Sequence, residues 1–151
     1  AGEVVSLTEF DLAEAESQVF EAQLQLEEDN VIQADELAYG AMLKAARGLI
    51  KTGFIDISDD PNQIVTEFRT RFFDTKIFFD RFARGKFAQY LFRRHARAHP
   101  PAGPDSVRQL IEEAQLFLEA THACQARLAS QPQLPPLPSP GTESSITEER
   151  S

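Results

Sequence analysis

The chain has 151 residues and a net charge of −9, and 42% of its residues are hydrophobic. This apolar content excludes a wholly disordered chain, and the length fits one domain of the usual size, about 100–200 residues. No apolar run reaches the roughly 18 residues that a membrane span requires, so the sequence predicts no membrane partner. The lone Cys124 has no partner for an internal disulfide, which favours a reducing, cytoplasmic location.

Charged residues are distributed unevenly along the chain. Residues 1–38 contain eleven acidic side chains and no Lys or Arg, whereas residues 67–99 contain nine Lys or Arg and three acids. A concentrated basic segment can attract a polyanion. The simpler interpretation is that the acidic and basic segments face each other or water.

The first half of the chain predicts two helices. Apolar residues spaced alternately three and four positions apart are typical of an amphipathic helix, here ending near Glu28. Its predicted stripe is Phe10, Ala13, Ser17, Phe20 and Leu24. A second helix, over 31–51, carries a row of small side chains that would let a neighbouring helix approach closely. That row is Ala34, Ala38, Ala41, Ala45 and Gly48. A second apolar row makes this helix central.

Three further helices are predicted in the second half. One starts at Asp60-Pro61 and continues toward Gly85, a second covers 86–98, and a third runs from Asp105 or Ser106 to about 128. From Ser130 the composition changes to Pro, Ser, Gln and Glu, which predicts a disordered tail over 130–151 after a domain over 1–129. The expected fold is an all-α bundle of four or five helices.

The blocks Ala38-Tyr39-Gly40-Ala41-Met42 and Ala45-Ala46-Arg47-Gly48-Leu49, preceded by a helix with Ala-Glu repeats, resemble the opening of HEPN-type helical domains. The resemblance covers residues 8–52 and extends more weakly to residue 128. It implies a HEPN-like bundle. It also implies that an Arg and a His with four to six residues between them can act in a metal-free ribonuclease at a dimer interface.

A second likeness covers residues 67–96, which read EFRTRFFDTKIFFDRFARGKFAQYLFRRHA. This block looks like a segment near the C-terminus of some bacterial sirohaem-dependent sulfite or nitrite reductases, where a helical domain follows the catalytic part. The likeness implies an accessory domain of a larger enzyme. The single Cys124 cannot by itself hold an iron–sulfur cluster, which takes several thiolates, so no cofactor is expected.

The basic segment supplies the candidate chemical site. Arg94 and His99 match the spacing of the family's ribonucleases, and they pair a cation with a group that titrates near neutral pH. A non-catalytic alternative is nucleotide or RNA binding. Its candidate residues are Arg93, Arg94, His95, Arg97 and His99. Arg and His also favour a last helical turn because they offset the helix dipole. No His, Cys, Asp or Glu grouping has the spacing of a metal site.

Phenylalanine is concentrated in the same segment, with eight of the twelve between Phe68 and Phe92. One helix face cannot bury them all, so part of them should form a partner-binding patch. Those on the predicted stripe, including Phe72 and Phe79, are assigned to the core. The interface candidates are Phe73, Phe78 and Phe82. The sequence thus favours a non-catalytic interaction or accessory domain that forms a homodimer or docks onto a parent enzyme. The alternative is the RNA-binding domain.

Overall fold

The computed structural model describes residues 2–54 and 56–130, with side chains from Asp11 onward. Over these residues the chain forms five α-helices and one π-helical segment, and no strand. The predicted all-α class is therefore confirmed. The predicted tail lies outside the described residues, except for Ser130, which ends the last helix. Within the described part, no helix combines the length and apolarity needed to cross a bilayer.

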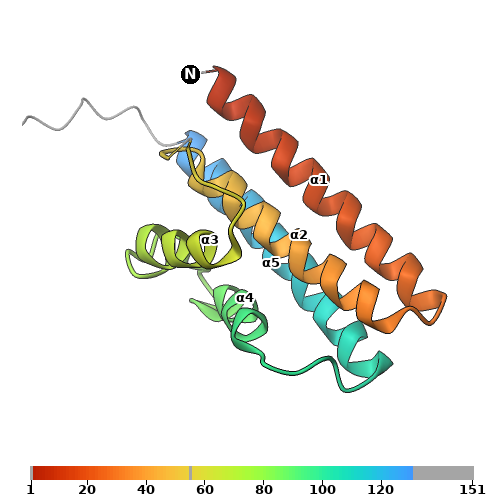
Figure 1. Cartoon of the computed structure of the whole chain (residues 1–151). Coiled ribbons are helices and arrows are strands. Elements are labelled where there is room, and N and C mark those ends of the chain that lie inside the picture. The colour runs from red at the N-terminus through yellow and green to blue at the C-terminus, as the bar shows by residue number, and fades with distance from the viewer. Residues whose placement is uncertain (1, 55, 131–151) are drawn as a thin grey trace, which may run out of the picture.

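Three long helices run side by side: α1 (Gly2–Glu27), α2 (Val31–Ile50) and α5 (Pro104–Ser130) (Figure 1). The turn between α1 and α2 passes through Asp29 with a φ of 66°, a left-handed conformation that Asp tolerates better than most residues. The small-residue row of α2 is buried as predicted. The helix is central, because it contacts both α1 and α5.

The buried face of α1 differs from the predicted stripe. The residues that face the core are Leu12, Ala15, Val19 and Ala22. Phe20 and Leu24 of the predicted stripe are 61% and 36% exposed. Because α2 presents small side chains and approaches closely, α1 packs against it with the row that contains alanines. The bulkier Phe20 consequently points outward.

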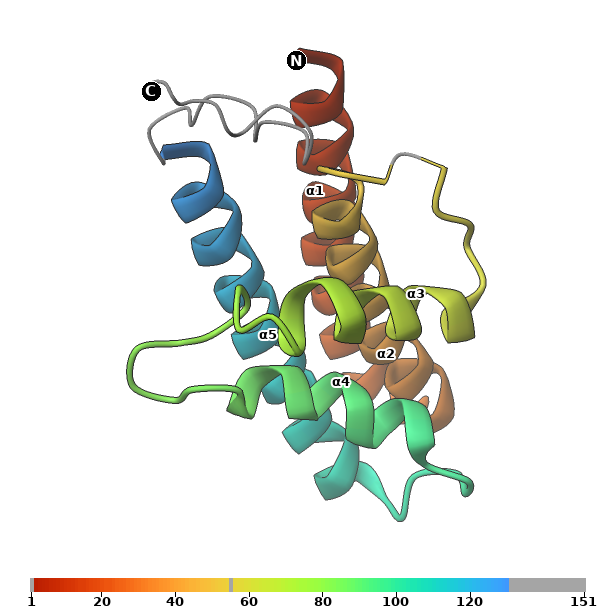
Figure 2. The same ribbon diagram turned by 90° about the vertical axis from the view of Figure 1, so that its left-hand side faces the viewer.

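Two shorter helices, α3 (Pro61–Phe68) and α4 (Lys86–Ala96), lie across the long ones (Figure 2). Asp60 caps α3 by accepting a hydrogen bond from the backbone N–H of Gln63 at 3.0 Å. α3 continues into the π-helical segment η1 (Arg69–Phe73) and ends there, although the sequence predicted a helix toward Gly85.

The π-helical turn explains why the predicted stripe fails beyond Phe72. The N–H of Asp74 bonds to the carbonyl of Arg69, five residues earlier. Beyond this wider turn, residues spaced three and four positions apart no longer lie on one face of the helix. After this turn Phe78 is buried, and Phe79, predicted to be core, is exposed. Residues 74–85 form a loop, referred to below as the Phe82 loop.

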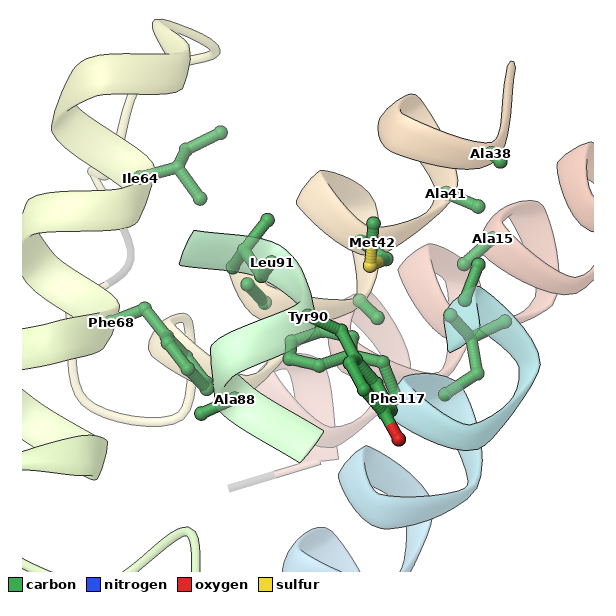
Figure 3. Close-up of a cluster of buried hydrophobic side chains, with 14 of the residues drawn as sticks. Ala15, Ala38, Ala41, Met42, Ile64, Phe68, Ala88, Tyr90, Leu91 and Phe117 are labelled. Carbon is green, nitrogen blue, oxygen red and sulfur yellow. The ribbon is translucent and has the colours of Figure 1, made fainter. Parts of the chain in front are cut away.

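An aromatic cluster joins the short helices to the bundle. The ring of Phe68 lies 5.0 to 6.0 Å, between centroids, from four other phenylalanine rings. These are Phe72, Phe78, Phe92 and Phe117. In Figure 3 the Phe68 ring points toward Ala88 of α4. The predicted burial of Phe68 and Phe72 is confirmed.

Candidate functional site

Two of the predicted anion-binding arginines are hydrogen-bonded inside the protein. Asp35 of α2, only 1% exposed, accepts a bond from Arg94 Nη2 at 2.7 Å. It also accepts bonds from Nη1 and Nη2 of Arg97, at 2.8 and 2.7 Å. The Arg94 guanidinium also lies 4.2 Å from the centroid of the Tyr39 ring. Both arginines therefore tie the C-terminal end of α4 to α2.

The charge of Asp35 follows from these contacts. Burial, the largest single influence, raises the pKa of its carboxyl group. The hydrogen bonds from Arg97 and Arg94, together with the two positive charges, outweigh burial and hold the pKa below the usual 3.8. The same pairing raises the pKa of Arg97. Asp35 is thus ionised at neutral pH and neutralises part of the basic segment.

His95 also faces inward. Its Nδ1 lies 2.7 Å from the hydroxyl oxygen of Tyr39, in a hydrogen bond between α4 and α2. Burial raises the pKa of Tyr39 above its usual 10.0, so the hydroxyl remains protonated at neutral pH. His95 therefore belongs to the same interhelical polar network as Asp35, and it is only partly accessible to a ligand.

The structure gathers three of the candidate residues and leaves His99 apart. Arg93, Arg94 and Arg97 line a depression of about 220 Å³ between α4 and α5. Arg93 is exposed and lies 3.6 Å from Glu113 on the opposite wall. His99 lies in the loop after α4, which ends at residue 96 rather than the predicted 98, and it does not line this depression.

The three interface candidates have different environments. Phe78 is only 3% exposed and belongs to the core, so it presents no docking surface. Phe73 is partly buried and meets Phe92 edge-on, with centroids 5.1 Å apart. Its ring lies so close to Gly85 that a Cβ there would come within 2.8 Å of Phe73 Cε1. Phe82 is 86% exposed, so its ring faces solvent in the isolated chain.

Phe82 sits on a turn that is fixed by hydrogen bonds. Asp80 and Arg84 exchange backbone N–H···O bonds of 2.8 Å across the base of the turn. The Asp80 side chain accepts bonds from the backbone N–H of Phe82 and of Ala83, at 2.7 and 2.6 Å. The bonds from Ala83 and Phe82 lower the pKa of Asp80. Arg84 closes the turn with a φ of 57°. The exposed ring is therefore presented by an ordered backbone.

The Phe82 loop combines apolar and basic side chains. Besides Phe82 it exposes two other large apolar residues, Ile77 and Phe79. Its exposed cations are Lys76, Arg81 and Arg84. The Arg81 guanidinium lies 5.5 Å from the centroid of the Phe82 ring. Such a grouping of an aromatic side chain with arginines is typical of residues that dominate protein interfaces.

The loop is attached to the outer side of α5. The carbonyl oxygen of Ile77 accepts a hydrogen bond from Arg127 Nη2 at 3.2 Å, and it lies 3.7 Å from the Cys124 thiol. A small depression between loop and helix is lined by Phe79, Arg84 and Ala123, among others. These contacts place the turn on the surface of the bundle rather than within it.

Sequence reasoning missed Asp35 and the exposed face of α1. The signal for Asp35 was a carboxylate on the small-residue face of α2, next to Ala34, where an acidic residue requires a buried partner. In the described part of the chain, no group of three or more His, Cys, Asp or Glu is arranged to hold a metal ion.

Comparison with known proteins identifies no relative, because no family model matches the chain and no similar curated protein or solved structure was found.

Proposed function

We propose that this chain is a non-catalytic interaction domain that docks onto a partner through the Phe82 loop. The observation that carries the proposal is Phe82 itself, 86% exposed on a hydrogen-bonded turn. A large ring held by an ordered backbone loses little conformational freedom when a partner covers it, so its burial contributes more to affinity. The arginines around it would orient an acidic partner.

The polar network of α4 supports a non-catalytic role. Arg94, one half of the candidate catalytic pair, compensates the charge of the buried Asp35, and His99 lies outside the depression that Arg94 lines. The partner can be a larger enzyme, because residues 67–96 resemble the helical appendages of reductases. Iron–sulfur Cys spacing encoded upstream in the same reading frame would support that form. A start codon directly before Ala1 would exclude a fusion to such an enzyme.

Photo-cross-linking in the native cell tests the docking role. A photoreactive phenylalanine analogue at position 82 should give an adduct of defined mass, whereas the analogue at exposed Gln89 of α4 should not. Excess unmodified chain should compete the adduct away, and a Phe82→Ala chain should not. If the Phe82→Ala chain competes equally well, Phe82 is not the docking residue.

A second candidate function is the binding of RNA or another anion, favoured by the three arginines around the depression between α4 and α5. Anisotropy of labelled RNA at low and moderate salt tests it, because phosphate contacts make affinity fall steeply with salt. Arg93→Ala should weaken binding without disturbing the Asp35 network. Metal-free cleavage that His99→Ala abolishes would establish the ribonuclease form. An absence of binding at low salt would remove this candidate.

A further inference from the structure

A second exposed apolar surface lies on α1 and carries the opposite charge to the Phe82 loop. Phe20, 61% exposed, and Leu24 follow each other one helical turn apart, on the same face as exposed Ala13. We refer to these three residues as the α1 stripe. Exposed Glu16, Glu27 and Glu28 lie within one turn of it. The whole segment 1–38 contains no Lys or Arg.

The α1 stripe borders a groove between α1 and α5. A depression of about 300 Å³ is lined by Glu16, Val19, Leu118 and Glu119, among others. It shares Glu16 with a depression of about 420 Å³ toward the C-terminal end of α5. It shares Gln115 with a third one, of about 350 Å³, toward the start of that helix. The acidic residues along this α1/α5 groove are Glu16, Glu27, Glu112 and Glu119. The cationic or titratable ones are Arg108 and His122, and His122 Nε2 lies 2.8 Å from Glu16 Oε2, so Glu27, Glu112 and Glu119 carry the acidic character of the groove.

The Phe82 loop cannot reach the groove of its own chain. The loop meets α5 at Ala123 and Arg127, whereas Leu118 and His122 face the groove. At 100° per residue these pairs lie on different sides of the helix. Figure 2 shows the same arrangement, with the loop projecting from α5 on the side away from α1. Contact between the two surfaces therefore requires two chains.

Charge decides which surfaces can pair. Two α1 stripes facing each other would bring glutamates against glutamates, and two Phe82 loops would bring arginines against arginines. Juxtaposed like charges disfavour an interface. The contact of one loop with one stripe joins opposite charges and covers apolar side chains on both sides. Charge complementarity thus favours a heterologous contact over either symmetric one.

We propose that the partner of the Phe82 loop is a second copy of this chain, and that the loop docks on the α1 stripe beside the α1/α5 groove. The inference rests on the proposed function, because it names the partner of the same loop. A heterologous contact leaves a free loop at one end and a free stripe at the other, so chains add head to tail or close into a ring. Because charge steers the contact, salt weakens it.

Sedimentation velocity of the full chain at increasing concentration provides the first test. At an ionic strength of about 0.01 M, where charges interact over about 30 Å, the average mass should rise above the 16.9 kDa of one chain. At about 1 M it should return to that value. A mass of one chain at every concentration in low salt overturns the proposal.

Mixing two variants tests the head-to-tail geometry. Phe82→Ala removes the docking ring, and Phe20→Glu places a charge in the stripe. Each should weaken self-association about 30-fold or more, the effect typical of a dominant interface residue. A mixture should form a 1:1 complex, because one variant retains an intact stripe and the other an intact loop. A symmetric loop–loop interface would leave Phe20→Glu associating alone, and a symmetric stripe–stripe interface would leave Phe82→Ala associating alone. Either result, or a mixture as dissociated as its components, overturns the proposal.

Ile32→Glu is the matched control, because Ile32 is also exposed, at 58%, and belongs to neither surface. It should associate like the unmodified chain, and circular dichroism should show all three variants helical. If Ile32→Glu disrupts association equally, general surface charge rather than the stripe is responsible, and the proposal fails. A chain that stays monomeric but still gives the Phe82-dependent cellular adduct would refute self-association and leave the docking role intact. A chain that neither self-associates nor gives the adduct would refute the docking role as well.

Discussion

At the scale of single residues, Asp35 holds α4 to α2 through its ion pairs with Arg94 and Arg97. Replacing it with Ala leaves the guanidinium groups of Arg94 and Arg97 without their shared partner in a largely buried place. Removing one member of a buried ion pair typically costs about 3–5 kcal/mol. We expect Asp35→Ala to lower the free energy of unfolding by about that amount in urea titrations. Exposed Glu36 is the control, and Glu36→Ala should change stability by no more than about 0.5 kcal/mol.

The pH dependence of this contribution follows from the lowered pKa of Asp35. A carboxyl group whose folded pKa lies below the unfolded value stabilises the fold above the unfolded pKa. That stabilisation is lost as the pH falls through the folded pKa. The contribution of Asp35 should therefore be complete at neutral pH and decline below its usual 3.8. Urea titrations of the unmodified chain and Asp35→Asn should diverge at neutral pH and converge in acid. A constant difference would contradict this linkage.

Two identical substitutions separate the core and surface roles of phenylalanine. Phe72 is buried and lies 5.9 Å, between centroids, from Phe68, whereas Phe82 is 86% exposed. Phe72→Ala should cost about 3–5 kcal/mol of stability because it opens a cavity in the aromatic cluster. Phe82→Ala should stay within about 0.5 kcal/mol of the unmodified chain. Thermal or urea unfolding of both variants provides the measurement, and a large loss in Phe82→Ala would show that the ring has a structural role.

At the scale of elements, the Phe82 loop depends on the two side-chain hydrogen bonds of Asp80. Asp80→Ala removes the acceptor for the N–H groups of Phe82 and Ala83. Hydrogen exchange should therefore accelerate at these two amides, while exchange in α2 and α5 stays unchanged. Asp74→Ala is a suitable control, because Asp74 is an exposed acid of the same loop. Unchanged exchange at Phe82 would mean that the backbone pairing of Asp80 with Arg84 is sufficient to order the turn.

Helices with a single regular period could be predicted from the sequence, and elements that change period could not. The small-residue row of α2 and the apolar residues of α5 at spacings of three and four, from Val107 to Cys124, repeat without interruption, and both rows are buried. In η1 the N–H of Asp74 bonds to the carbonyl of Arg69, so this turn contains one residue more than an α-helical turn. The spacing of apolar residues in the sequence does not indicate such a turn. In α1 two apolar stripes compete, and only the steric demand of α2 selects the one with Val19.

Site prediction had a similar limit. The excess of phenylalanine correctly indicated that a ring would be exposed. Identifying that ring as Phe82 required knowing where α3 ends. The spacing of Arg94 and His99 matched a family pattern, yet spacing contains no information about Asp35, 59 residues away from Arg94 in sequence. Long-range ion pairs depend on which helices are neighbours, which a single sequence does not reveal.

At the scale of the whole molecule, the acidic and basic segments neutralise each other only in part within one chain. Lys51 pairs with Asp11 at 2.9 Å, and Lys44 with Glu14 at 3.0 Å, so the acids of α1 are neutralised on the side that faces α2. Asp35 likewise neutralises the inner arginines of α4. The outer acids of α1 and the cations of the Phe82 loop face different sides of the bundle. The molecule therefore has an acidic side and a basic side, and a partner of opposite charge can neutralise either one.

Cys124 offers a probe of how firmly the loop is attached to the bundle. The thiol is 1% exposed, and its sulfur lies 3.7 Å from the Ile77 carbonyl oxygen of the loop. Burial raises its pKa above the usual 9.0, so little of the thiol is present as the reactive thiolate at neutral pH while the loop covers it. A thiol reagent should therefore label the native chain far more slowly than the unfolded one, through opening of the loop.

Asp80→Ala should accelerate this labelling without lowering the free energy of global unfolding, because it loosens only the loop. If the loop docks on another chain, labelling of the unmodified protein at low salt should also slow as the concentration rises, since the docked loop opens less often. The Phe82→Ala chain should show no such concentration dependence. Labelling that tracks global unfolding in every variant would instead show that the loop and the bundle open as one cooperative unit.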